Sequence, residues 1–173
     1  IALKYNTTRE DPDWLIMELS SYQLEAAPEI SPKIGIWTNL TPDHLERHGS
    51  IDAYSNIKQR LLENSQTCIY NADDQFLIQH RQKMKPGIWV STQGGSSSQG
   101  ISDFWINETG MIVERGKELF DSSTLEIPGN HNKQNLLLVT AAARAIGIDG
   151  ISIQKSIRSF VGVPHRLEKI GNF

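Results

Sequence analysis

The chain of 173 residues has a single cysteine, Cys68, and so cannot form an internal disulfide. This absence excludes the disulfide framework of a small secreted domain and favours the reducing cytoplasm as its location. Because Cys68 lies in the apolar run Cys-Ile-Tyr, we interpret it as a buried small apolar residue.

An excess of charge is absent as well, since 17 Lys and Arg stand against 20 Asp and Glu and give a net charge of −3 with the histidines neutral. This balance excludes a strongly basic nucleic-acid binder, so no nucleic-acid partner is expected. No apolar stretch approaches the roughly 20 residues of a membrane span, and the first residues lack a signal-peptide pattern. We therefore expect no membrane partner and one globular domain.

A third absence is the phosphate-binding loop Gly-x-x-x-x-Gly-Lys-Ser/Thr, which a nucleotide-using α/β protein is expected to contain. The dipeptide Gly116-Lys117 is followed by Glu118 and does not qualify, and no glycine precedes Gly35. If the chain belongs to a nucleotide-using protein, this part of the phosphate contact is missing from it.

What is present is an alternation of apolar runs with segments of helical spacing. Strands are predicted at residues 14–19, 34–40, 67–70 and 88–90. Helices are predicted at residues 50–64, 73–84, 130–146 and 152–160, the first with Ser50 as its N-cap. Three short segments between residues 104 and 125 predict a small antiparallel ribbon, and a further strand is expected to begin at Ile170. The predicted fold class is α/β, with a mostly parallel sheet flanked by helices.

Glu18 is the first candidate for chemistry, because it lies near the end of the apolar run at residues 14–19. A carboxylate in a buried strand costs several kcal/mol unless it is paired or binds a metal ion. Ser20, Ser21 and Gln23 would add polar groups at the same sheet edge. The alternative is that Glu18 already lies in solvent at the end of its strand.

His44 is the second candidate, in a loop-like stretch at residues 39–49 that also contains Asp43 and Glu46. Imidazole and carboxylate groups bind divalent ions, so this stretch suits metal or phosphate chemistry. The alternative is an ordinary solvated loop. A structural zinc site is not supported, because the sequence has neither a cysteine cluster nor a His-Glu-x-x-His helix.

Lys58 is the third candidate. Helical spacing places it on the flank of an apolar stripe that includes Tyr54 and Leu62. A lysine on such a face usually extends along it until its amine reaches water. If the amine points into a cleft instead, it becomes available for chemistry.

Two later motifs complete the candidates. Asn132 and Asn135 share a face at the start of a predicted helix, where their amides suit either a base edge or loop carbonyls. Arg166 follows Pro164 and is suited to bidentate contact with phosphate, with an ordinary salt bridge as the alternative.

Taken in order, these motifs resemble the Mur ligase superfamily, the ATP-dependent ligases that build the peptide of peptidoglycan. The sequence of residues 18–25, Glu-Leu-Ser-Ser-Tyr-Gln-Leu-Glu, is most similar to that of the D-glutamate-adding branch. The loop and Lys58 alone would not separate this branch from the one that adds diaminopimelate or lysine. The resemblance covers nearly the whole chain and is carried by residues 18–25, 39–45, 58, 71–74, 129–132, 135 and 164–166.

The resemblance implies two magnesium sites. Glu18 would hold the ion that bridges the ATP phosphates, and His44 would help to hold a second ion near the substrate carboxylate. Lys58 would react with CO2 to form a carbamate, whose anionic oxygen can bind a metal ion as a protonated amine cannot. Asn132, Asn135 and Arg166 would contact the nucleotide, and Ser20, Ser21 and Gln23 would contact the muramoyl-alanine substrate.

The implied reaction uses ATP, UDP-N-acetylmuramoyl-L-alanine and D-glutamate. The alanyl carboxylate would attack the γ-phosphate of ATP to give an acyl phosphate, and the amine of D-glutamate would then displace phosphate. Magnesium would offset the repulsion between the two anions. His44 and Lys58 would be the catalytic groups.

One departure from the family pattern bears on activity. The family's phosphate loop and uridine-binding domain belong before Glu18, and its D-glutamate-binding domain belongs after Phe173. We therefore expect residues 1–173 to be a partial central ATP-binding domain that is inactive alone and binds ATP weakly. We also expect an exposed sheet edge through which copies of the chain self-associate. The alternatives are a silent remnant or interaction module of the same fold, and a folylpolyglutamate synthase-like ligase.

Overall fold

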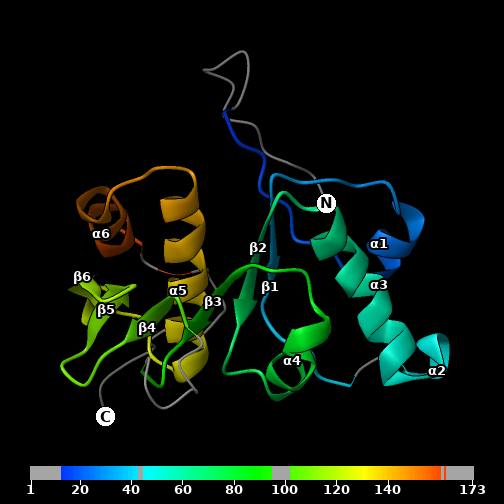
Figure 1. The fold of residues 1–173 in the computed structure, drawn as a ribbon. Helices are drawn as coiled ribbons and strands as arrows, with labels where there is room; N and C mark the ends of the chain where they lie inside the picture. The colour runs from blue at the N-terminus through cyan, green and yellow to red at the C-terminus, as the bar shows by residue number, and fades with distance from the viewer. Residues whose placement is uncertain (1–12, 43–44, 95–101, 161, 163–173) are drawn as a thin grey trace, which may run out of the picture.

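The computed structural model describes residues 13–42, 45–94, 102–160 and 162, and its centre is a six-stranded sheet with the strands in sequence order (Figure 1). The first four strands run parallel to one another, and the last three form an antiparallel ribbon that shares β4 with them. The strands are β1 (Ile34–Trp37), β2 (Thr67–Asn71), β3 (Ile88–Ser91), β4 (Phe104–Ile106), β5 (Met111–Glu114) and β6 (Lys117–Asp121). The predicted α/β class and the ribbon are therefore confirmed.

Helices cover both faces of the sheet. α5 packs against β2, β3 and β4 on one face, with α6 beside it on β6, whereas α3 and α4 lie on the other face against β1 and β2 (Figure 1). α1 and α2 pack on α3. The α-helices are α1 (Ser21–Ala26), α2 (Leu45–His48), α3 (Ile51–Asn64), α4 (Gln75–His80), α5 (Asn130–Ala145) and α6 (Gly150–Arg158), and two 3-10 turns are η1 (Arg81–Lys83) and η2 (Ser122–Thr124).

Side-chain caps set where α3, α4 and α6 begin. The hydroxyl of Ser50 accepts a hydrogen bond from the Ala53 amide (3.1 Å), which confirms the predicted cap of α3. Asp74 caps α4 and Asp149 caps α6 in the same way. The turn between β5 and β6 is the dipeptide Arg115-Gly116, in which both residues have positive φ, as the type I′ turn of a two-residue hairpin requires.

Two separate clusters of buried side chains form the interior. The first, which we call the aliphatic core, lies between the sheet and α5 and α6; its buried members are Ile69, Val90, Phe104, Ile106, Ile112, Phe120, Leu136, Leu137, Leu138, Ala141 and Ile153. The second, the aromatic core, lies between the sheet and α3 and α4; its buried members are Trp37, Leu40, Tyr54, Leu62, Cys68, Tyr70, Ala72, Leu77, Met84 and Trp89. Because side chains alternate along a strand, β2 sends Ile69 into one cluster and Cys68 and Tyr70 into the other. Cys68 is buried, as predicted.

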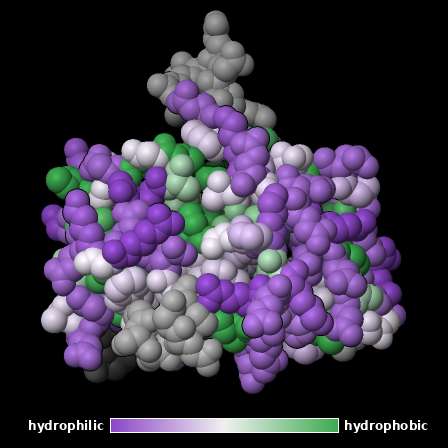
Figure 2. Space-filling view, viewed as in Figure 1, coloured by the Kyte–Doolittle hydropathy of each residue, from purple (hydrophilic) through white to green (hydrophobic). Residues whose placement is uncertain are grey.

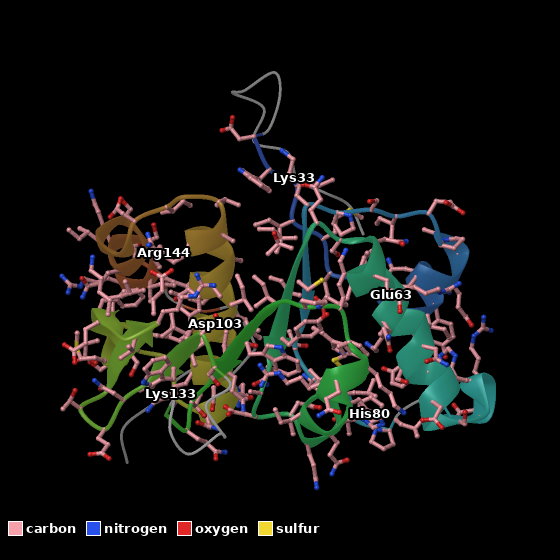
Figure 3. The ribbon with its side chains drawn as sticks, in the orientation of Figure 1. Lys33, Glu63, His80, Asp103, Lys133 and Arg144 are labelled. Atoms are coloured by element: carbon pink, nitrogen blue, oxygen red, sulfur yellow. The ribbon has the colours of Figure 1, made fainter. Side chains whose placement is uncertain are left out.

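Two sets of polar side-chain interactions join the antiparallel ribbon to the rest of the domain. Asp103 accepts a hydrogen bond from the Trp89 amide (3.0 Å) and another from Arg115 (3.1 Å), and so links β3 to the turn between β5 and β6. Arg144 on α5 pairs with Glu114 on β5 at 2.8 Å. Both Asp103 and Arg144 are labelled in Figure 3, on the half of the molecule that contains α5 and the ribbon.

The predicted strand at residues 14–19 is wrong. In the structure this segment forms no strand, and the side chains of Trp14, Leu15, Ile16 and Met17 are exposed. A buried strand needs a neighbour that accepts its ladder of hydrogen bonds, and among the described residues β1 pairs with β2 alone. An apolar run without such a neighbour lies outside the sheet, as the trace preceding α1 does in Figure 1.

Other differences concern element boundaries. The strand predicted at 34–40 ends at Trp37, the helix predicted at 73–84 divides into α4 and η1, and the segment at 119–125 divides into β6 and η2. α1 and α2 were not predicted, because residues 20–26 and 39–49 were interpreted as polar or loop segments. The strand expected from Ile170 lies outside the described residues.

The visible face of the molecule is largely hydrophilic, with hydrophobic residues gathered mainly in its upper middle part (Figure 2). No helix within the described ranges combines the length and the apolar character needed to cross a bilayer.

Candidate functional site

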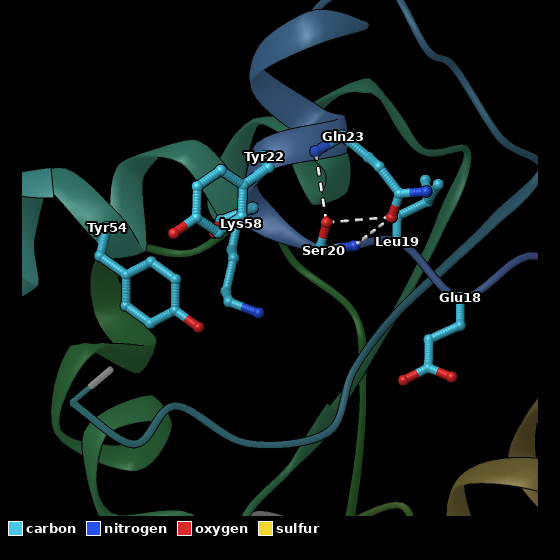
Figure 4. A pocket seen from close by; sticks show the side chains of 8 residues that line it. Glu18, Leu19, Ser20, Tyr22, Gln23, Tyr54 and Lys58 are labelled. Atoms are coloured by element: carbon cyan, nitrogen blue, oxygen red, sulfur yellow. Dashed lines mark hydrogen bonds between the residues drawn. The ribbon is translucent and has the colours of Figure 1, made fainter. Parts of the chain in front are cut away.

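Five of the nine predicted site residues line one pocket of about 340 Å³ (Figure 4). Its wall is made by two segments: residues 18–23, which lead into α1 and form its first turn, and one face of α3. Glu18 and Lys58 are 40 positions apart in the sequence and meet here because α1 packs on α3. The lining residues are Glu18, Leu19, Ser20, Ser21, Tyr22, Gln23, Tyr54 and Lys58.

Ser20 and Gln23 form a reciprocal cap at the start of α1. The Ser20 hydroxyl accepts a hydrogen bond from the Gln23 amide (3.3 Å), and the Gln23 side-chain oxygen accepts one from the Ser20 amide (2.8 Å). This capping box explains why a Ser and a Gln stand three residues apart, independently of any ligand. It also fixes the backbone that presents Ser21 and Tyr22 to the pocket.

Lys58 lies on the pocket side of α3, half-buried, with its Nζ 5.1 Å from the centre of the Tyr54 ring. Tyr54 itself belongs to the aromatic core and is buried. A cation over an aromatic face is stabilised electrostatically, so the ring holds the end of a long side chain close to the pocket. Of the two interpretations of Lys58, the structure therefore favours an amine directed toward a cleft (Figure 4).

Behind the pocket wall is a buried histidine, His48, the last residue of α2. Its side chain is 1% exposed, and its ring stacks on Tyr54 with the centroids 5.1 Å apart. Its Nε2 lies 3.1 Å from the Ser21 hydroxyl, and its Nδ1 lies 3.7 Å from a carboxylate oxygen of Glu25. This histidine connects the wall of the pocket to α1.

Glu25 and Arg47 tie α1 to α2 on the outer side of His48. Arg47 donates to the same Glu25 oxygen through Nη2 (2.8 Å) and Nε (3.3 Å). The hydrogen bond from Arg47 lowers the pKa of the Glu25 carboxyl below its usual value, so Glu25 is held as a carboxylate. Arg47 also lies over the Tyr22 ring, 4.8 Å from its centre.

The pocket fits a magnesium ion in one respect. Glu18 contributes a carboxylate, and Mg²⁺ is commonly held by one or two carboxylates together with phosphate oxygens and water. In the part of the chain that the structure describes, no three His, Cys, Asp or Glu side chains gather into a metal-binding group. Glu18 therefore fits the role of a single ligand, whereas Lys58 as a protonated amine does not. His44 lies outside the described residues.

A second polar cluster braces the carboxyl ends of the strands. The carboxylate of Asp73, just after β2, accepts hydrogen bonds from the Ser91 hydroxyl (2.6 Å), from the Thr92 amide (2.9 Å) and hydroxyl (2.6 Å), and from Gln134 of α5 (3.3 Å). This arrangement joins β2, β3 and the first turns of α5. It gives a structural reason for an acid in the motif at residues 71–74.

The predicted nucleotide-binding residues Asn132 and Asn135 are not part of the pocket. The side-chain amide of Asn132 donates to the Pro128 carbonyl (2.7 Å), so this residue serves its own helix start, and Asn135 is exposed on α5. Arg166 lies outside the described residues, so no distance relates it to the asparagines.

Three residues at or beside the pocket are not among the predicted site residues: Tyr22, Tyr54 and His48. Tyr54 was interpreted as part of the apolar stripe of α3, which is correct, but its ring also lines the pocket. His48 was visible only as one more polar residue in the stretch at residues 39–49. Its partners Ser21 and Glu25 are more than 20 positions away, and no local spacing indicates such contacts.

Two curated relatives of the chain carry the same name. The chain is 58% identical over 170 residues to the UDP-N-acetylmuramoylalanine–D-glutamate ligase of one strain of Prochlorococcus marinus, covering 98% of this chain and 36% of the relative. It is 55% identical over 173 residues to the protein of the same name from a second strain, P. marinus MIT 9313, covering 99% of this chain and 38% of the relative. The chain thus spans little more than a third of the length of these relatives.

Solved structures of related ligases share the fold. A UDP-N-acetylmuramoyl-L-alanyl-D-glutamate–2,6-diaminopimelate ligase superposes with a TM-score of 0.65 at 24% identity, covering 86% of this chain and 32% of that one. The UDP-N-acetylmuramate–alanine ligase of Thermotoga maritima gives a TM-score of 0.60 at 25% identity, covering 79% and 31%. The sequence profile of the Mur ligase middle domain matches residues 2–143. Since that match includes the pocket-lining residues 18–23, 54 and 58, the chain belongs to the Mur ligase middle-domain family.

Proposed function

We propose that this chain is the central domain of an ATP-dependent ligase that joins D-glutamate to UDP-N-acetylmuramoyl-L-alanine in the biosynthesis of peptidoglycan. The observation that carries the proposal is the pocket lined jointly by Glu18, Lys58 and the Ser-Ser-Tyr-Gln segment. The names of the relatives that are 58% and 55% identical support the choice of substrates. In such a reaction the substrate carboxylate and the ATP γ-phosphate, both anions, must meet, and a metal-binding carboxylate in the pocket would help to offset their repulsion.

In this proposal the chain's own residues bind and orient the two anionic reactants. Glu18 and, from outside the described residues, His44 would hold Mg²⁺, which when bound supplies positive charge between the alanyl carboxylate and the ATP γ-phosphate. Lys58, as a carbamate, would contribute an anionic oxygen beside the same Mg²⁺. Ser20, Ser21 and Gln23 would contact the muramoyl-alanine group. Asn132 and Asn135, at the start of α5, would contact the nucleotide together with Arg166.

The state of Lys58 is a separate part of the proposal. The family resemblance implies a carbamate on this lysine, which would convert it from a cation over the Tyr54 ring into an oxygen ligand. Incubation of the full-length ligase with ¹³C-bicarbonate should then give a carbamate carbon signal by NMR that the Lys58→Met variant lacks. The absence of that signal in the wild type would contradict the carbamate and leave the assignment of the pocket unaffected.

The proposed activity can be tested on a full-length ligase that carries this chain as its middle domain. Phosphate release from ATP is expected to require both UDP-N-acetylmuramoyl-L-alanine and D-glutamate, and to fail with L-glutamate. Equal release with a folate and glutamate would favour a folylpolyglutamate synthase-like ligase. If none of these substrate pairs gives phosphate release, a silent remnant or interaction module is favoured.

The isolated chain of 173 residues is expected to form no product. It lacks the Gly-x-x-x-x-Gly-Lys-Ser/Thr loop, so calorimetric titration with Mg-ATP should give weak binding at best. Tight binding would contradict this expectation. We further propose that the ligase acts in the cytoplasm.

A further inference from the structure

His48 does not line the pocket, yet it contacts three residues that do: Ser21, Tyr22 and Tyr54. The Tyr22 and Tyr54 rings lie 5.7 and 5.1 Å from the imidazole, so the ring plane is fixed by packing. A buried imidazole needs partners for both nitrogens, and here each nitrogen faces one polar side chain. The histidine is therefore placed to act on the pocket through its neighbours.

The charge that faces Nδ1 bears on which nitrogen of His48 carries the proton. Glu25 directs one carboxylate oxygen toward Nδ1 at 3.7 Å, while Arg47 holds its other oxygen. A negative oxygen on that side favours a proton on Nδ1, which leaves Nε2 as an acceptor. Since the Ser21 hydroxyl is 3.1 Å from Nε2, it must then donate its proton to His48.

We propose that His48 is a positioning residue whose Nε2 accepts the hydroxyl hydrogen of Ser21. Ser21 then offers only the lone pairs of its oxygen to the pocket and accepts a hydrogen bond from an N–H or O–H group of the ligand. The opposite tautomer would turn the Ser21 hydroxyl hydrogen toward the pocket and suit a carboxylate or phosphate oxygen. The inference rests on the proposed function in one respect: the amide N–H groups of UDP-N-acetylmuramoyl-L-alanine are the donors that Ser21 would meet.

The tautomer can be measured without any ligand, on the 173-residue chain labelled with ¹⁵N-histidine. Long-range ¹H–¹⁵N spectra should show a protonated Nδ1 and an unprotonated Nε2 for His48. Ser21→Ala should shift the Nε2 resonance and leave Nδ1 in place. A proton on Nε2, or an Nε2 resonance that ignores Ser21→Ala, would overturn the proposal.

The consequence for the ligand is tested by kinetics on the full-length ligase. His48→Phe keeps the ring that stacks on Tyr54 but loses both nitrogens, whereas His48→Gln restores an acceptor. We expect His48→Phe and Ser21→Ala each to raise the KM for UDP-N-acetylmuramoyl-L-alanine about tenfold, with the KM for ATP unchanged and with His48→Gln recovering most of the loss. The double variant should be no worse than either single variant.

Two results would overturn the positioning role. One is a loss in His48→Phe that affects both KM values equally, as general destabilisation would; the other is independent, multiplicative losses for Ser21→Ala and His48→Phe. If the wild-type ligase does not use UDP-N-acetylmuramoyl-L-alanine, the proposed function fails. The tautomer spectra then decide the Ser21–His48 relation by themselves.

Discussion

The two faces of the sheet are packed with different kinds of side chain. The aliphatic core contains Ile, Val, Leu, Ala and two Phe residues, none of which has a polar atom in its side chain. In the aromatic core, by contrast, the rings also form hydrogen bonds: the Trp37 indole donates to the Asn39 carbonyl (3.1 Å), and the Tyr70 hydroxyl donates to the Lys85 carbonyl (3.0 Å).

This difference indicates that the aliphatic core serves the stability of the fold, whereas the aromatic core also supports the pocket. Side chains with an apolar body and a polar end can belong to a core and still reach a wet surface, as Tyr54 does when it packs in the aromatic core and lines the pocket. Aliphatic side chains can only fill space. We therefore expect changes in the aliphatic core to affect folding and leave the pocket intact, and changes near the aromatic core to affect the pocket.

The largest effect on stability is expected from Leu137→Ala in α5. This side chain is 0% exposed, and shortening it should lower the free energy of unfolding by about 3 kcal/mol because it leaves a cavity. Val139→Ala on the same helix, at a side chain 51% exposed, is the control and should change it by less than about 0.5 kcal/mol. Urea unfolding measures both, and equal effects would contradict the assignment of the core.

A smaller loss is expected from Asp73→Asn, which weakens the polar brace between β2, β3 and α5. The carboxylate accepts hydrogen bonds through both of its oxygens, whereas the amide of Asn has only one accepting oxygen. The free energy of unfolding should therefore fall by about 2 kcal/mol. Hydrogen exchange at the Thr92 amide should speed up more than exchange at Ile69. Glu108→Gln, at an exposed turn residue, is the control, and a similar loss there would show that the effect comes from net charge and not from the brace.

The exposed sheet edge predicts a modest effect on association. Ile36 on β1 is 37% exposed, and Lys is a residue that discourages pairing of edge strands. If the chain self-associates through β1, Ile36→Lys should reduce the dimer fraction in analytical gel filtration, whereas Ile148→Lys, at a side chain 39% exposed elsewhere, should not. A monomer in the wild type would contradict the expected self-association.

The smallest effect is expected at low pH, from the ion pair between Glu25 and Arg47. The pKa of Glu25 is lowered chiefly by its hydrogen bond from Arg47, so the pairing stabilises the fold above the carboxyl's ordinary pKa of 4.5 and is lost as pH falls through the lowered folded value. Arg47→Gln should return the Glu25 pKa toward 4.5, as followed by the side-chain carboxyl carbon in an NMR titration. A Glu25 pKa that is the same in both proteins would show that Arg47 does not set it.

The sequence predicted best what depends on local spacing or composition. α3 follows from a periodic stripe over 14 residues, and Lys58 was singled out because a charged group stood in that stripe. Glu18 lines the pocket too, but it is exposed and lies in no strand, so the buried strand that led to its choice was wrong. α2 has only four residues and α1 only six, too few for a period to be recognised. The strand expected at residues 14–19 failed for another reason, since an apolar run indicates burial and cannot indicate which neighbour provides it.

The contacts of His48 lie beyond such reasoning. They join Ser21 at the start of α1, Glu25 one turn later and Tyr54 on α3, and this meeting is decided by how three helices pack. The capping box at Ser20 and Gln23 is predictable from the spacing of a Ser and a Gln three residues apart, although the family resemblance implies only substrate contacts for both.

The central claim is that Glu18 and Lys58 serve one site, and a double-mutant cycle in the full-length ligase tests it most directly. Glu18→Gln and Lys58→Met should each lower kcat/KM about a hundredfold, and the double variant should be within about tenfold of either one, because residues that act as a unit are not additive. Glu29→Gln and Lys155→Met, at exposed positions outside the pocket, are the matched controls and should leave kcat/KM unchanged. Losses that multiply in the double variant, or an unchanged rate in either single variant, would contradict the claim.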